Sequence, residues 1–120
     1  MPHVVLDGRS GAEALEAYVA RFEPSVFREG DLVVKIERLY RDSAGRGALL
    51  ETIVSERGHT QKFFIQLAPK QAELTVRLEP LTDPEKTPAV RRALAVVAAR
   101  VVAAAGCAYA RSNIDAYLMR

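Results

Sequence analysis

Four segments with the two-residue alternation of β-strands follow one another closely in the middle of this chain, and they constrain the fold more than any other feature. They span residues 32–40, 48–56, 59–67 and 72–79. The intervals between them are short and rich in turn residues, such as DSAGRG at 42–47 and Arg57-Gly58. Connections this short make neighbouring strands antiparallel. We therefore expect a four-stranded antiparallel β-meander.

The alternation predicts one apolar face for this sheet and one face of mixed character. The expected inward side chains are Leu32, Val34, Ile36, Tyr40, Phe63, Ile65, Leu67, Ala72, Leu74, Val76 and Leu78. The other face is expected to carry charged residues together with Val33, Leu39 and Phe64. Segment 48–56 alternates less clearly, so its register stays open. This pattern is typical of a sheet that is covered on one side.

Two helices are expected to provide that cover. Ser10 and Glu13 form a capping box that begins the first helix, which ends before Pro24. Thr87 and Pro88 begin the second helix, which runs to about Gly106. Its main apolar stripe consists of Val90, Leu94, Val97 and Val101.

The two ends of the chain leave more open. The VVL run at 4–6 fits a fifth short strand or an ordered tail, and Ser112 and Asp115 have the spacing of a further short helix start. At 120 residues the chain can bury one core, so we expect a single α+β domain over residues 1–120. The order strand, helix, four strands, helix resembles the TATA-binding-protein-like, helix-grip arrangement. That resemblance implies a fold and no activity.

The composition of the chain limits which partners and which cellular compartment we expect. Seventeen basic and 15 acidic residues give a net charge of +2, too small to draw the chain strongly to nucleic acid or anionic lipid. The single cysteine, Cys107, excludes an internal disulfide and fits a reducing compartment. The first residues lack the pattern of a signal peptide, and Arg100 interrupts the most apolar helix, which disfavours a membrane span. We expect a cytoplasmic protein.

The sequence offers no pattern typical of an active site. His3 and His59 have no partner at metal-ligand spacing, and the chain contains no nucleophile motif and no glycine-rich phosphate loop. Cys107 follows Gly106 in an alanine-rich stretch and is expected to be a buried, unreactive thiol. We therefore expect no catalytic residue, no metal and no cofactor, and a protein that is not an enzyme.

The function favoured by these observations is a non-enzymatic interaction or assembly module that forms a homodimer. Apolar residues outside the expected core carry this prediction. They are Val33, Leu39 and Phe64 on the open sheet face, and Val96 and Val102 off the main stripe of the long helix. An exposed apolar surface of this kind marks an interface. The sequence does not identify a partner other than a second copy.

Two alternatives stay open. A long helix against a curved sheet can enclose a cavity for a small apolar ligand. The open sheet face can instead bind nucleic acid, with Phe64 as a stacking residue. The candidate contacts for nucleic acid are Lys35, Arg41, Lys62 and Arg77. Acidic residues expected on the same face, namely Glu37, Glu73 and Glu79, oppose this alternative.

Overall fold

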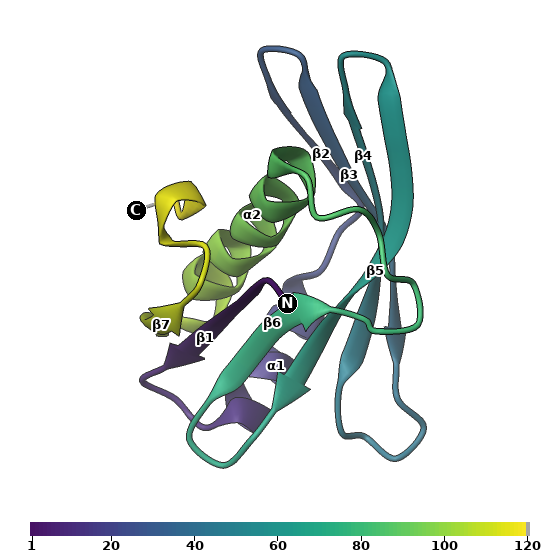
Figure 1. Ribbon diagram of the computed structural model, residues 1–120. Helices are drawn as coiled ribbons and strands as arrows, with labels where there is room; N and C mark the ends of the chain where they lie inside the picture. The colour runs from purple at the N-terminus through teal and green to yellow at the C-terminus, as the bar shows by residue number, and fades with distance from the viewer. Residues whose placement is uncertain (120) are drawn as a thin grey trace.

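The computed structural model of the protein, which describes residues 1–119, is an α+β fold in which a curled antiparallel sheet holds two helices on its concave side (Figure 1). The strands are β1 (His3–Asp7), β2 (Ser25–Glu29), β3 (Leu32–Arg41), β4 (Ala48–Glu56), β5 (His59–Pro69), β6 (Leu74–Leu78) and β7 (Ala108–Ser112). The helices are α1 (Gly11–Arg21) and α2 (Pro88–Ala105), with a short 3₁₀ turn, η1, at Asp115–Tyr117.

The sheet has seven strands in the order β2-β3-β4-β5-β6-β1-β7, so the predicted four-stranded meander is too small. The consecutive hairpins run from β2 to β6, and β1 then pairs with both β6 and β7. The VVL run is therefore a strand. Because β2 and β7 were not anticipated, the TATA-binding-protein-like element order is not matched exactly. Both missed strands are short, and their sequences, SVFRE and AYARS, do not alternate regularly between apolar and polar residues.

The predicted helix ends are confirmed. The Ser10 hydroxyl accepts a hydrogen bond from the Glu13 amide at 3.1 Å, and the Thr87 hydroxyl accepts one from Val90 at 3.3 Å. These bonds satisfy amides that have no partner inside the helix. Gly106 ends α2 in the left-handed conformation with φ 69°. The local sequence therefore sets where both helices begin and where α2 ends.

Helix α2 is enclosed on most of its sides by the rest of the chain. It packs against α1, β1, β4 and β6, and its predicted stripe is fully buried. Val96 lies off that stripe yet is only 4% exposed, and Val102 is half-buried against the core. Phe63 and other buried apolar side chains of the inner sheet face belong to one core cluster with the stripe of α2. An alanine-rich helix suits this position because its small side chains permit close approach.

Strand β4 has a polar residue on its inner face, which explains its unclear alternation. Thr52 is fully buried between Leu50 and Val54, which also face the helices. The Thr52 hydroxyl donates a hydrogen bond to the carbonyl of Leu50 at 3.0 Å. A buried hydroxyl with a partner avoids most of its desolvation penalty. The register left open by the sequence is therefore Leu50, Thr52 and Val54 inward.

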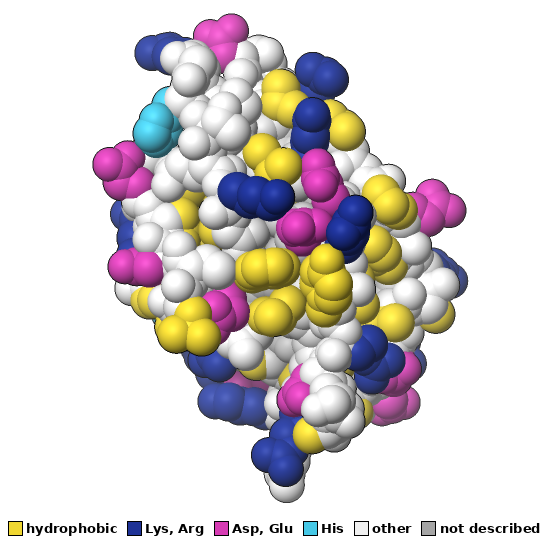
Figure 2. All heavy atoms as spheres, turned by 90° about the vertical axis from the view of Figure 1, so that its right-hand side faces the viewer, with side chains coloured by type: hydrophobic (Ala, Val, Ile, Leu, Met, Phe, Trp, Pro, Cys, Tyr) yellow, Lys and Arg dark blue, Asp and Glu magenta, His cyan; other side chains and the backbone are white. Residues whose placement is uncertain are grey.

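A β-bulge in β3 reverses the faces of its second half. The pairing with β4 shifts between Ile36 and Arg38, so the side chains of Glu37 and Arg38 both lie on the outer face. Beyond the bulge, Leu39 pairs with inward-facing Leu50 and packs against the core. Tyr40 turns to the outer face, which is the face seen in Figure 2. The prediction that Tyr40 faces inward and Leu39 outward is wrong, because simple alternation does not allow for an extra residue.

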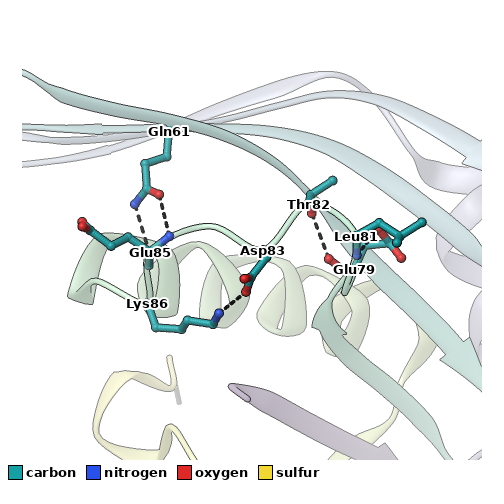
Figure 3. A network of polar contacts seen from close by, with 7 residues as sticks. All are labelled: Gln61, Glu79, Leu81, Thr82, Asp83, Glu85 and Lys86. Carbon is teal, nitrogen blue, oxygen red and sulfur yellow. Dashed lines mark hydrogen bonds and ion pairs between the residues drawn. The ribbon is translucent and has the colours of Figure 1, made fainter.

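The linker between β6 and α2 runs alongside the part of β5 that β6 does not cover. The Glu79 amide donates to the carbonyl of Phe64 at 2.9 Å. Further along, the side-chain amide of Gln61 makes two hydrogen bonds to the backbone of Glu85, at 2.8 and 3.2 Å (Figure 3). Lys86 pairs with Asp83 in the same segment. The linker thus occupies backbone groups of β5 that a strand would otherwise pair.

Within residues 1–119, neither helix combines the length and the apolar character that crossing a bilayer requires.

Candidate functional site

The outer face of the sheet carries an apolar patch that the rest of the chain leaves partly exposed. We define the outer-face patch as Val26, Val33, Tyr40, Leu49, Ile53 and Phe64. Tyr40 is 44% exposed and Val26 is 50% exposed. Alternation fixes their direction, because the neighbours of each one along its strand face the helices. Six neighbouring apolar side chains on one open face form a candidate interaction surface.

A band of charges divides the outer-face patch into two groups (Figure 2). One group consists of Tyr40, Leu49 and Phe64, and the other of Val26, Val33 and Ile53. Glu51 lies at the centre of the band and is 15% exposed, 3.8 Å from the guanidinium of Arg38 and 3.9 Å from the ammonium of Lys62. The pKa of Arg38 is raised, first by its hydrogen bond and electrostatic interaction with Tyr40 and then by the charge of Glu51. The band therefore holds two cations around one carboxylate.

A pocket of about 430 Å³ adjoins the group that contains Tyr40 and Leu49. Its lining also includes Arg46 from the β3–β4 loop and Arg77 and Glu79 from the β6 end of the sheet. The Arg77 guanidinium donates a hydrogen bond to the Gln66 side chain at 2.7 Å, which holds Arg77 across the face. The pocket combines an aromatic wall with charges of both signs.

The structure separates the five apolar residues that the sequence proposed for an interface. Val33 and Phe64 lie on the outer face as expected. Leu39 lies on the helix side, and Val96 is buried within the chain. Val102 is half-buried against the core. Only Val33 and Phe64 of these five therefore belong to the outer-face patch.

The four basic residues proposed for nucleic-acid contact are also divided. Lys35, Lys62 and Arg77 lie on the outer face. Arg41 follows the bulge and lies on the helix side, where its guanidinium pairs with Glu16 of α1 at 2.5 Å. Placing Arg41 on the open face was therefore wrong, for the same reason as for Tyr40.

Sequence reasoning missed several residues of this site. Tyr40 and Arg38 were missed because the sequence of β3 contains no signal for the bulge. Leu49 and Ile53 were left out because the register of β4 was open. Val26 was missed with its strand, although the Gly30-Asp31 pair that joins β2 to β3 is a hairpin signal. Gly30 adopts φ 58°, as that turn requires.

The described residues show little that resembles reactive chemistry. Across residues 1–119, no three His, Cys, Asp or Glu side chains cluster in a way that could hold a metal ion. Cys107 is buried, and burial raises the pKa of its thiol. A raised pKa lowers the thiolate fraction at neutral pH and hence the reactivity.

Comparisons with models of protein families, with curated proteins and with solved structures return no match. The function of the chain must therefore be argued from its own surface.

Proposed function

We propose that this protein is a non-enzymatic interaction module that forms a homodimer through the outer-face patch. The observation that carries the proposal is the patch itself, in which Tyr40 and Phe64 lie beside Leu49 on an open sheet. Aromatic residues with an apolar body and a polar tip are enriched at protein interfaces. The bulge in β3 contributes by bringing Tyr40 to this face.

The layout of the patch suits a second copy of the same chain. One apolar group lies on each side of the charge band, as Leu49 and Ile53 do on either side of Glu51 along β4. A twofold axis that lies in the interface and crosses the strands sets each group on the other group of the partner. The same axis brings the two charge bands together, and each band contains both signs, with Arg38 and Lys62 beside Glu51. Mixed charges permit this contact, whereas a face of one sign would repel its copy.

The proposal is tested by the molar mass in solution, measured by light scattering at tens of micromolar chain. We expect a dimer, and a clean monomer at that concentration contradicts the proposal. Tyr40→Glu should shift the population toward monomer because it places a carboxylate in the apolar group. Met119→Glu is the matched control, since Met119 is also 44% exposed but lies outside the sheet. Circular dichroism of both variants verifies that the fold persists.

Binding of single-stranded nucleic acid to the same face is a second candidate, favoured by one observation. The bulge adds Tyr40 to Phe64, so the open face carries two aromatic rings with Lys62 nearby. Such rings can stack on bases while cations contact phosphates. This candidate predicts binding of an oligonucleotide that weakens with salt and strengthens in Glu51→Gln. Absence of binding at low salt excludes it.

An apolar ligand held between α2 and the sheet has less support, because side chains that would line its cavity, such as Phe63 and Leu94, belong to one buried core cluster.

A further inference from the structure

A second pocket, on the helix side of the sheet, lies where the end of α1, the start of β2 and the C-terminal half of α2 meet. Its volume is about 260 Å³. The lining residues are Tyr18, Arg21, Phe22, Glu23, Ser25, Arg100 and Ala104. These residues come from three elements, so the fold brings them together, and no sequence motif predicts the pocket.

Tyr18 is the most informative residue of this pocket. It is only 5% exposed, and its ring packs edge-to-face against Phe22 with centroids 6.1 Å apart. Its hydroxyl makes no hydrogen bond to any residue from 1 to 119. Among residues 1–119, every fully buried side-chain nitrogen or oxygen has a hydrogen-bond partner. Because the Tyr18 hydroxyl has none, it is not fully buried, and it reaches the open space of the pocket. Burial, partly offset by the charge of Arg100, raises the pKa of Tyr18 to about 12, so the hydroxyl stays a proton donor at neutral pH.

Arg100 supplies a charge to the same pocket. The guanidinium is half-buried and donates a hydrogen bond to the hydroxyl of Ser25. Within the described chain no carboxylate lies within 4.0 Å of it, although nine other basic residues have such a partner. Because Ser25 accepts from Arg100, its own proton is free to be donated. Three donor groups therefore converge on one space.

The remaining walls limit what can bind. Arg21 adds a second guanidinium, while Glu23 and the carbonyl end of α1 bring negative potential to their side. An anion must therefore bind toward Arg100 and away from Glu23. Phe22 and Ala104 provide an apolar wall beside it. A ligand that matches both the donor groups and the apolar wall has one oxyanion and a small apolar body.

We propose that this pocket binds a small organic carboxylate, with the carboxylate on Arg100, Ser25 and the Tyr18 hydroxyl, and its apolar part against Phe22 and Ala104. A guanidinium binds a carboxylate through paired hydrogen bonds, and bonds to charged acceptors are the strong ones. The site is independent of the outer-face patch and of the dimer proposed on it.

The test is a titration of the full-length protein with benzoate at pH 7, followed by amide chemical shifts. We expect shifts centred on Phe22, Ser25 and Ala104 and a dissociation constant of about 1 mM, typical of a ligand this small. Benzamide, which has nearly the same shape and no charge, should bind at least about tenfold more weakly. Inorganic phosphate should also bind more weakly, since it lacks the apolar body. Equal binding of phosphate or of benzamide overturns the assignment of an organic carboxylate.

Two variants address the donors. Tyr18→Phe removes one hydroxyl that has no partner within residues 1–119, so the melting temperature should stay unchanged while benzoate binds about tenfold more weakly. Arg100→Gln should abolish measurable binding. The matched control is Arg91→Gln, the same change on α2 at a residue that lines a different pocket, and it should leave binding intact. Binding by Tyr18→Phe as tight as that of the wild type overturns the proposal.

Discussion

The ring of Tyr40 lies edge-to-face against that of Phe64, with centroids 6.1 Å apart and planes at 73°. The two residues come from β3 and β5, and β4 lies between their strands. They meet because the bulge at Glu37 and Arg38 turns Tyr40 outward. This single irregularity places the ring of Tyr40 on the outer face and the side chain of Leu39 against the core.

The first prediction separates Leu39 from Tyr40. Leu39→Ala should lower the free energy of unfolding by about 2 kcal/mol, because it leaves a cavity beside the core. Tyr40→Ala should lower it by about 1 kcal/mol or less, the contribution of an exposed aromatic pair. Urea denaturation of both variants measures the difference. A larger loss of stability in Tyr40→Ala than in Leu39→Ala would indicate simple alternation in β3 and would falsify the bulge.

The second prediction concerns the Tyr18 side chain at alkaline pH. Its pKa is about 12 in the folded protein and about 10 in the unfolded chain, so the unfolded state loses its proton first. Stability from this group is therefore complete below pH 10 and is lost as the pH rises from about 10 to 12. The loss amounts to about 2–3 kcal/mol. Unfolding free energies measured across this range should show a shallower decline in Tyr18→Phe than in the wild type.

The third prediction concerns Gly11, the first residue of α1. Its amide donates to the carbonyl of Lys70 at 3.1 Å, which brings the helix start against the β5–β6 turn. A Cβ at this position would collide with the carbonyl oxygens of Lys70 and Glu73. Gly11→Ala should therefore destabilise the protein by more than about 2 kcal/mol, because backbone must move.

Gly106→Ala provides the comparison for Gly11. An added Cβ meets no described atom within 4 Å there, so the penalty comes from φ 69° alone and should be about 1 kcal/mol. Thermal melts of the two variants measure the contrast. A Gly11→Ala protein as stable as Gly106→Ala contradicts the close approach of α1 to the turn.

The fourth prediction concerns the linker that leads from β6 to α2. Gln61→Ala removes two hydrogen bonds to the backbone of Glu85 and should cost about 1–2 kcal/mol. Hydrogen exchange at the Glu85 amide should accelerate in the variant, since that amide donates to Gln61. The control is Gln71→Ala, because Gln71 is exposed and lies outside the linker. Unchanged exchange at Glu85 shows that the linker is held by other contacts.

Much of the fold was predictable because its signals are local. The Ser10 and Thr87 caps depend on residues within one turn, and the alternation of Leu74, Val76 and Leu78 depends on the pleat of a single strand. Strand β7 was not predictable in this way. Its five residues, AYARS, have weak strand character, and pairing with β1 places them in the sheet.

The candidate sites were less predictable than the fold. The sequence identified Val33, Phe64, Lys35, Lys62 and Arg77 on the outer face, since each lies where alternation holds. Tyr40, Leu39 and Arg41 were misplaced because the bulge shifts them by one position, and a one-residue shift exchanges the two faces. The pocket at Tyr18 and Arg100 left no sequence signal, since 82 positions separate the two residues.

The sequence by itself determined the two helices with their ends, the four longest predicted strands and the apolar faces of most of them, because capping and side-chain periodicity act over a few neighbouring residues. Only the tertiary structure decided the seven-stranded order, the bulge that exposes Tyr40 and the meeting of Tyr18 with Arg100. These features depend on pairing and packing between residues that lie far apart along the chain. A local sequence pattern does not contain the free energy of such contacts.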